Sequence, residues 1–156
     1  MNNASFNYVR TYRRRYALSE EELAFLTGRR SVTAGLHALT AAGPRLAIVT
    51  QGAQGCSYQS PNGEGKVPGY PVRVLDTTGA GDAFVAGLLV GLLASSASNT
   101  IALPPVPQLE RVLAYANATA ALSTERRGGI PGLPSRRRVD TFLRAQHGPE
   151  GLCEGG

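Results

Sequence analysis

Hydrophobic and polar positions between residues 19 and 42 alternate with the spacing of α-helices and predict two short helices. The first begins with a capping box, in which Ser19 is the hydroxyl N-cap and Glu22 stands three positions later. The second, over residues 31–42, carries apolar residues at helical intervals and ends at Gly43-Pro44.

The pattern changes at Leu46–Thr50, where a continuous apolar run lies between turn signals. Such a run is typical of a strand that is buried on both faces in a parallel sheet. Cys56–Ser60 and Lys66–Leu75 flank the turn residues Pro61-Asn62-Gly63, so we expect a hairpin at the edge of the sheet. Residues 1–16 have no clear period and predict a basic, poorly specified lead-in.

Three more helices are expected in the C-terminal part of the chain. They are the strongly apolar Ala83–Ala94, the one-sided Gln108–Ser123 and the short Ser135–Ala145. A loop over 95–107 and irregular backbone over 128–132 separate them. The alternation of helix, strand and helix predicts an α/β layered fold.

Composition narrows the functional classes. At 156 residues and 42% hydrophobic residues, the chain can bury the core of one domain. No run approaches the ~20 apolar residues that span a bilayer, and no leader-like apolar segment occurs, so a cytoplasmic protein without membrane contact is expected. The net charge of +5 comes from short basic clusters, which favour solvated faces over nucleic-acid binding. Cys56 and Cys153 fit small apolar positions better than a disulfide or metal site.

The segment Asp76–Asp82 carries the strongest chemical signal, because it stands directly before the apolar helix. Gly79 and Gly81 leave backbone N–H groups unobstructed where that helix begins, and the helix dipole adds positive charge there. These features predict an anion hole of phosphate size. Asp82 beside it can accept the proton of a hydroxyl that attacks the phosphate. A simple helix cap needs only one such residue, so the full motif favours phosphoryl transfer.

The motif DTTGAGD, followed by Ala83–Gly87, resembles the C-terminal signature of the phosphofructokinase-B (pfkB), or ribokinase-like, carbohydrate kinase family. Three more motifs follow the family's order. Leu18–Gly28 resembles its acidic segment that ends in Leu-Thr-Gly. Ile48–Gly55 resembles its nucleotide-binding Thr-x-Gly-x-x-Gly loop, and Tyr115–Pro134 is similar to the helix and loop that cover the adenine.

The resemblance implies a ribokinase-like three-layer α/β/α sandwich, of which this chain holds the C-terminal half. Residues 19–145 would form the ATP-binding and catalytic part, between the lead-in 1–18 and a flexible tail, 146–156. The family's first strands, sugar pocket and β-lid have no counterpart in residues 1–18, so we expect a truncated, split or partial chain. Its uncovered sheet edge and apolar face would favour a homo-oligomer or a complementing N-terminal half.

The resemblance also assigns catalytic and nucleotide-binding roles. Asp82 would be the catalytic base, and the backbone amides of Gly79, Ala80 and Gly81 would form the anion hole. The residues that match the family's ATP contacts are Thr50, Gly52, Gly55 and Asn117. From the sequence alone, Asn117 fits an exposed polar helix position equally well, and the glycine loop also fits a plain strand-to-hairpin turn.

Two cation roles follow from the same resemblance. Glu22 matches an acidic residue that acts on Mg²⁺ through water, which suits a hard cation that retains its waters; its capping-box role can coexist with this one. Asp76 and Thr78 match a monovalent-cation site, with K⁺ in the family. The backbone carbonyls that would complete it belong to Ser123, Arg126, Gly128 and Gly132.

The expected ligands are therefore ATP with Mg²⁺, K⁺ and a small sugar. Ser19 stands where most ribokinases carry Asn, as in fructokinase-like members, and Gly129–Pro134 resembles a fructokinase pattern. Both features favour fructose over ribose, a nucleoside or a keto-deoxy sugar acid. A non-catalytic, nucleotide-binding remnant is the alternative from a different class.

Overall fold

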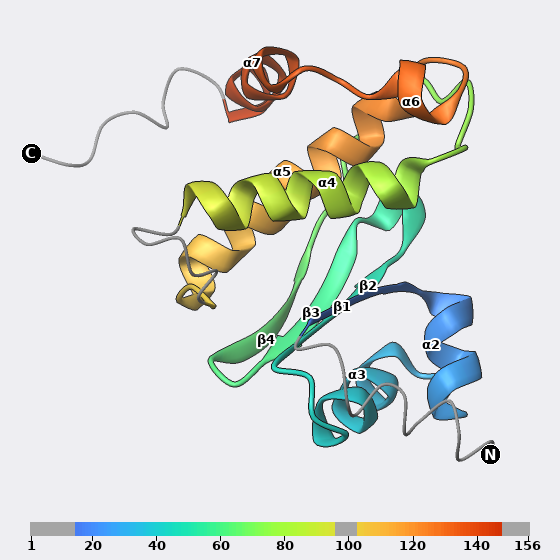
Figure 1. Cartoon of the computed structure of the whole chain (residues 1–156), viewed down its shortest axis with the longest axis vertical. Coiled ribbons are helices and arrows are strands. Elements are labelled where there is room, and N and C mark those ends of the chain that lie inside the picture. The colour runs from blue at the N-terminus through green and yellow to red at the C-terminus, as the bar shows by residue number, and fades with distance from the viewer. Residues whose placement is uncertain (1–14, 96–102, 148–156) are drawn as a thin grey trace, which may run out of the picture.

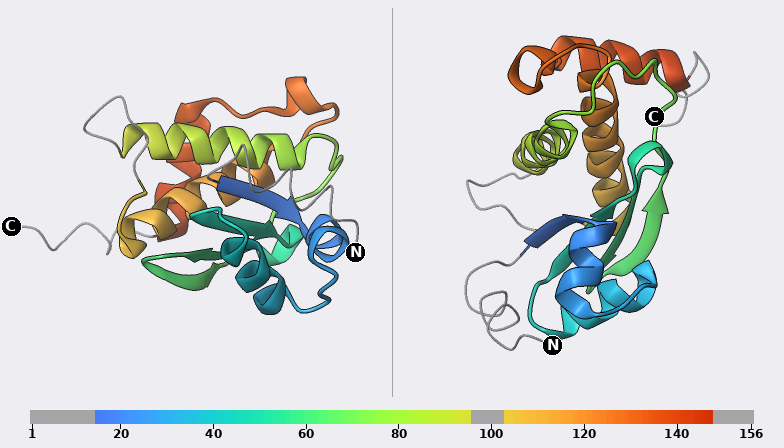
Figure 2. Two further views of the ribbon diagram at one scale, coloured as in Figure 1. Left: turned by 60° about the horizontal axis from the view of Figure 1, so that its bottom comes forward. Right: turned by 90° about the vertical axis from the view of Figure 1, so that its right-hand side faces the viewer.

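The computed structural model describes residues 15–95 and 103–147, which fold into three layers (Figure 1). The strands are β1 (Arg15–Ser19), β2 (Leu46–Thr50), β3 (Cys56–Ser60) and β4 (Gly63–Val67). The helices are α2 (Glu20–Thr27), α3 (Val32–Ala41), α4 (Ala80–Ala94), α5 (Val106–Ser123), α6 (Gly129–Gly132) and α7 (Arg136–His147). The sheet has the order β1-β2-β3-β4, with α2 and α3 on one face and α4 and α5 on the other (Figure 2). The predicted α/β/α sandwich is confirmed.

Strand β2 is the centre of the core because both of its faces are covered. Leu46 and Ile48 pack with the cluster formed by α4 and α5, whereas Ala47 and Val49 pack with α2 and α3. All four side chains are fully buried. Alternate side chains of a strand point to opposite faces, so one apolar run supplies both hydrophobic clusters.

Strand β1 was not predicted. Residues 15 and 16 were expected in an irregular lead-in, yet Arg15–Ser19 pairs in parallel with β2, from Arg15 opposite Leu46 to Ser19 opposite Thr50. Ala17 packs toward α4 and α5, and Leu18 packs toward α2 and α3. Two apolar side chains, Ala17 and Leu18, therefore carry the strand, and the preceding arginines concealed that pattern. The rest of the predicted lead-in, residues 1–14, lies outside the described residues.

The predicted edge hairpin is present, but its second strand is misplaced in the prediction. Strand β4 runs over Gly63–Val67, antiparallel to β3, and not over 66–75. Ser60 Oγ accepts from Asn62 N–H (3.2 Å) and donates to Gly63 O (2.9 Å), which closes the turn. Pro68 then ends the strand, because proline has no N–H for the ladder.

The helices confirm the periodic pattern with shifted boundaries. Helix α4 begins at Ala80 and not at Ala83, α5 begins at Val106, and α7 extends beyond the predicted end to His147. The segment predicted to be irregular contains the one-turn helix α6. Among the described residues, no helix is both long and apolar enough to cross a membrane. Cys56 is buried with a free thiol, and burial raises its pKa to about 12; Cys153 lies outside the described residues.

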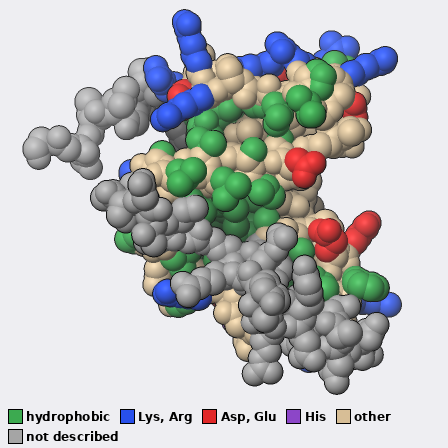
Figure 3. All heavy atoms as spheres, in the orientation of Figure 1, with side chains coloured by type: hydrophobic (Ala, Val, Ile, Leu, Met, Phe, Trp, Pro, Cys, Tyr) green, Lys and Arg blue, Asp and Glu red, His purple; other side chains and the backbone are tan. Residues whose placement is uncertain are grey.

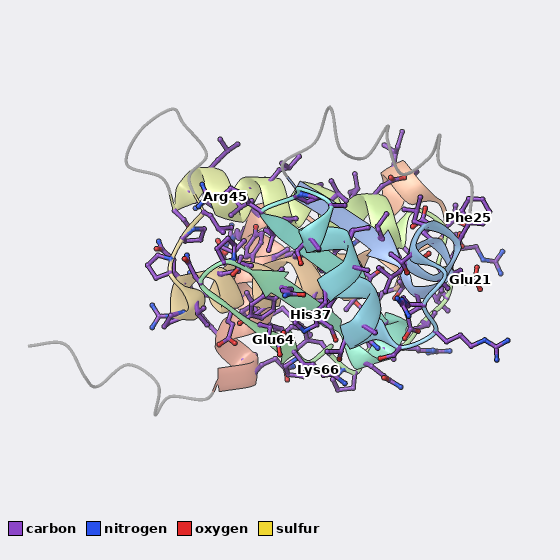
Figure 4. The ribbon with its side chains drawn as sticks, turned by 90° about the horizontal axis from the view of Figure 1, so that it is seen from below. Glu21, Phe25, His37, Arg45, Glu64 and Lys66 are labelled. Carbon is purple, nitrogen blue, oxygen red and sulfur yellow. The ribbon has the colours of Figure 1, made fainter. Side chains whose placement is uncertain are left out.

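Helix α3 is also tied to the outer edge of the sheet by polar contacts. Figure 4 shows His37 of α3 beside Glu64 of β4, with 3.1 Å between His37 Nε2 and Glu64 Oε2. His37 Nδ1 lies 2.8 Å from Gln59 Nε2 on β3. These exposed contacts join α3 to both strands of the hairpin.

Two apolar side chains from the helices on the same face of the sheet should contribute very differently to the free energy of unfolding, because their burial differs. Leu39→Ala removes a side chain of α3 that has no solvent exposure, so the free energy of unfolding should fall by about 2–5 kcal/mol. Phe25→Ala removes a larger side chain of α2 that is 83% exposed, so the free energy of unfolding should change by less than about 0.5 kcal/mol. Denaturant unfolding measures both, and equal losses would contradict the assigned core.

Candidate functional site

The turn before α4 depends on Gly79. Its φ of +80° places it in the left-handed region, and a Cβ there would lie 2.9 Å from the Cα of Gly129. Residues with side chains rarely adopt that φ, and the contact with α6 leaves no room for one. A glycine at this position therefore allows α4 to begin at Ala80 with α6 packed against the turn.

The amides that follow Gly79 are only partly used by the protein. Ala80 N–H donates to Thr77 O at 3.1 Å. Within the part of the chain that the structure describes, the N–H groups of Gly81 and Asp82 have no acceptor. Both residues are exposed, and a Cβ at Gly81 would meet nothing within 4 Å. Of the amides predicted to form the anion hole, those of Gly79 and Gly81 thus have no acceptor among the described residues, the Ala80 amide is engaged by Thr77 O, and Asp82 adds a further free N–H.

Two cavities meet at this turn. We call the first the loop cavity; its volume is about 310 Å³, and it lies between the β2–β3 loop, the segment after β4 and α5. We call the second the strand cavity; it measures about 340 Å³ and lies between β1, α2 and the start of α4. The residues that line both are Thr50, Thr77, Ala80, Gly81 and Phe84. A group held by the free amides is therefore accessible from either side.

The structure sorts the predicted site residues between these cavities. Those that line the loop cavity are Thr50, Gly52, Gly55 and Asn117, together with Ala80 and Gly81. Those that line the strand cavity include Glu22, Gly79 and Asp82. The predicted ligands of the monovalent cation line neither cavity and lie behind the turn. The predicted nucleotide contacts thus line the loop cavity, the predicted base and magnesium residue share the strand cavity, and Ala80 and Gly81 line both.

The glycine loop is more constrained than a plain turn requires. Gly55 has φ +92°, and a Cβ there would lie 2.1 Å from Val67 O. Thr50, at the end of β2, donates its hydroxyl to Leu18 O at 3.3 Å, which joins the loop to β1. The backbone of this loop is therefore held close to the end of β4, and it forms a firm wall of the loop cavity.

Asn117 is buried, so the alternative of an exposed helix position is wrong. Its Nδ2 donates to Val67 O and Pro68 O, both at 3.1 Å. Turning the amide around would place Oδ1 against two carbonyl oxygens, so these contacts fix its orientation. Asn117 therefore anchors the end of β4 to α5, on the wall of the loop cavity.

Asp76 holds the turn to the loop after α5. Its Oδ2 accepts from Gly128 N–H (2.8 Å) and its Oδ1 accepts from Thr78 N–H (2.9 Å). These hydrogen bonds, with the Gly128 bond the largest cause, lower the pKa of the Asp76 carboxyl to about 2. The N–H groups of Leu75 and Asp76 both donate to Thr124 O, at 2.8 and 3.1 Å. The backbone before the anion hole is thus fixed from two directions.

The residues behind the turn fit a monovalent cation. A Cβ at Gly132 would lie 2.8 Å from Ser123 O and 3.7 Å from Arg126 O, so these carbonyl oxygens converge on the end of α6. The Asp76 carboxylate reaches the same loop at Gly128. Carbonyl and carboxylate oxygens are suitable ligands for a hard cation. Such an ion would stabilise the loop that packs against Gly79.

The strand cavity fits a magnesium ion that keeps its waters. Glu22 Oε2 accepts from Ser19 N–H at 2.8 Å, and Glu22 N–H donates to Ser19 Oγ at 3.2 Å, so the predicted capping box is confirmed. The same carboxylate lines the cavity with Asp82. Among the described residues, no group of three His, Cys, Asp or Glu side chains could hold a metal. Water and phosphate oxygens would therefore complete the coordination.

Sequence reasoning missed one wall of the loop cavity. Residues 70–74 were expected in a strand, but they form no strand or helix, and Tyr70, Val72 and Val74 line the cavity. The signal was present in Pro68 and Pro71, because two prolines within four residues argue against a strand. The facing wall comes from α5, through Ala120, Ala121 and Thr124.

Comparison with known proteins supports the same chemistry. A sequence profile described as pfkB family carbohydrate kinase matches residues 16–136. The chain is 41% identical over 123 residues to fructokinase-1 of Oryza sativa subsp. japonica. That alignment covers 78% of this chain and 37% of the rice protein. The chain therefore spans little more than a third of this curated relative.

Solved structures of related kinases match the fold. A double-mutant fructokinase from Vibrio cholerae O395, bound to fructose, ADP and potassium, is 37% identical with a TM-score of 0.74. The match covers 84% of this chain and 41% of that one. Aminoimidazole riboside kinase from Salmonella enterica, bound to aminoimidazole riboside and an ATP analog, is 30% identical with a TM-score of 0.74. That match covers 88% of this chain and 44% of the kinase. These matches confirm the predicted fold class.

The lowered pKa of Asp76 predicts a specific dependence of stability on pH. Its pKa is about 2 in the folded protein and near 3.8 when unfolded, so its contribution is present above pH 3.8 and is lost toward pH 2. The free energy of unfolding of the wild type should therefore fall more steeply from pH 4 to 2 than that of Asp76→Asn. Urea unfolding at several pH values measures both, and parallel curves would contradict this role.

Proposed function

The chain belongs to the pfkB family of carbohydrate kinases, and we propose that it forms the nucleotide-binding and catalytic part of an ATP-dependent sugar kinase. One observation carries the proposal: two cavities meet at the free amides of Gly81 and Asp82. A nucleotide in the loop cavity would place its terminal phosphate at these amides. An acceptor in the strand cavity would approach the same phosphate from the other side.

Asp82 is the proposed catalytic base. The acceptor hydroxyl oxygen attacks the γ-phosphorus, its proton passes to the Asp82 carboxylate, and the bond from that phosphorus to the β,γ-bridging oxygen breaks, which releases ADP. The amides at the start of α4 stabilise the charge on the transferring phosphoryl oxygens, and the helix dipole adds to this effect. Asp82 lines the strand cavity beside these amides, as the step requires.

The proposed cations act around this step. Mg²⁺ bound to the nucleotide would neutralise phosphate charge, with Glu22 contacting it through water. K⁺ would lie behind the turn, near Asp76, Thr78 and the carbonyls of Ser123, Arg126, Gly128 and Gly132. The fructokinase of Vibrio cholerae O395 was solved with potassium and ADP, which supports a nucleotide and a monovalent cation in this chain too.

Fructose is the favoured acceptor. The curated relative reported above and one structural neighbour are fructokinases, and that neighbour was solved with fructose. A second neighbour binds aminoimidazole riboside at lower identity, so a riboside is the next candidate.

The strand cavity is bounded on one side by β1, and the unpaired edge of that strand favours a partner. No described strand pairs with the outer edge of β1. Beside it, the outward face of α4 carries Val85, Leu89, Val90 and Leu93, which are 38–55% exposed (Figure 3). A helix that is apolar on all sides usually packs against protein on all sides. We propose that a complementing N-terminal half, or a second copy, covers this surface and completes the acceptor site.

Gly81→Ala tests nucleotide binding without loss of the fold. The new methyl group would meet no protein atom, so the free energy of unfolding should be unchanged or slightly raised. The methyl group would point into the space for phosphate, and ATP affinity should fall by about tenfold or more, the factor for about 1.4 kcal/mol. Titration calorimetry of both proteins measures the change. Equal affinity would contradict the assigned anion hole.

Asp82→Asn separates catalysis from binding. Mixed with the N-terminal half of a related kinase, the wild-type chain should phosphorylate fructose, and the variant should be about 10²- to 10⁴-fold slower because the base is lost. ATP affinity should stay within about twofold, since the backbone amides remain. Turnover is measured by ADP release. A wild-type mixture that binds ATP and transfers no phosphate would favour the non-catalytic remnant.

A further inference from the structure

Tyr70 belongs to two parts of the molecule at once. It lines the loop cavity, and it also packs in a hydrophobic cluster with Ala118 and Leu122 of α5 and Val139 of α7. Its ring lies edge-to-face on Phe142 of α7, with 5.3 Å between the ring centroids and 77° between the planes. The side chain is half-buried in this contact, and burial raises the pKa of its hydroxyl. A cavity wall is therefore attached to a helix outside the cavity.

A second contact joins α7 to the other end of the same wall. Arg138 donates to Glu125 Oε2 at 2.7 Å, and both side chains are about one-third exposed or less. Glu125 directly follows Thr124, which lines the loop cavity and whose carbonyl accepts the N–H groups of Leu75 and Asp76. Helix α7 thus contacts both segments that close the cavity.

Helix α7 supplies none of the residues that line the loop cavity. The family profile matches residues 16–136, so it ends where α7 begins. The segment between β4 and α4, which forms this wall of the loop cavity, contains no strand or helix and only a single turn at its end. Its position must come from contacts such as those of Tyr70 and Leu75.

We propose that Phe142 is a positioning residue for nucleotide binding, which acts by holding Tyr70 on the wall of the loop cavity. The proposal rests on the proposed function, because it assigns the nucleotide to that cavity. Without the Phe142 ring, the segment around Tyr70 samples positions that no longer fit the nucleotide. The nucleotide then binds only the fraction of molecules with the wall in place, and its apparent affinity falls.

The test is the affinity of a fluorescent ATP analogue for the full chain and its variants. Phe142→Ala should raise the Kd about three- to tenfold, the factor that corresponds to one edge-to-face aromatic contact. Phe142→Leu keeps apolar volume and serves in case the alanine variant fails to fold. It should also raise the Kd. Phe142→Tyr, which keeps the ring edge, should retain the wild-type Kd. In a Tyr70→Ala background, Phe142→Ala should cause little further rise of the Kd, because the Tyr70–Phe142 contact is already absent.

Leu39→Ala is the matched control, since it removes buried volume from the opposite layer and does not contact the cavity. It should lower the melting temperature and leave the Kd unchanged. Amide hydrogen exchange over residues 70–76, measured without nucleotide, should be faster in Phe142→Ala than in Leu39→Ala.

A melting temperature that falls in Phe142→Ala with unchanged Kd and unchanged exchange would overturn the proposal. If the wild type bound no nucleotide, the proposed function would fail by itself. The exchange comparison would still decide whether Phe142 positions the wall.

Discussion

The close approach of two backbones at Gly79 and Gly129 is the constraint on which the rest of the site depends. The contact is possible only because Gly79 has no side chain and adopts a left-handed φ. It places α6 behind the turn, where the Asp76 carboxylate accepts the N–H groups of both Thr78 and Gly128. The amides at the start of α4 are therefore fixed in space before any anion arrives. Preorganised donors of this kind cost no reorganisation when charge develops.

The layered sheet brings the remaining groups to the same place. Strand β2 is buried on both faces, and it ends at Thr50, which lines both cavities. Strand β1 runs parallel to it and ends at Ser19, so the capping box that holds Glu22 lies at the same edge. Ligand sites of open α/β sheets lie outside the carboxyl ends of parallel strands. The geometry of the sheet thus explains why residues distant in sequence share one site.

Sequence reasoning worked where a local pattern had a single structural solution. The apolar run Leu46–Thr50 between turn signals predicted the buried strand β2, and the glycine-rich segment before α4 predicted a helix start with free amides. It failed where tertiary contacts decide the outcome. The arginines before Ala17 concealed β1, whose stability comes from pairing with β2. The burial of Asn117 depends on two carbonyl oxygens near the end of β4, about fifty residues away along the chain. No local pattern contains that information.

The two cavities differ in how completely this chain builds them. The loop cavity is enclosed by the glycine loop, the wall around Tyr70 and α5, and each of these is held by contacts within the chain. The strand cavity has β1 as one boundary, and no described strand pairs with the outer edge of β1. Asp76, Asn117 and Tyr70 lie outside the strand cavity, but Thr50 lines both cavities and donates its hydroxyl to Leu18 O of β1. The proposed nucleotide site is therefore enclosed by contacts within this chain, whereas the proposed acceptor site is bounded by a strand edge that no described strand pairs with.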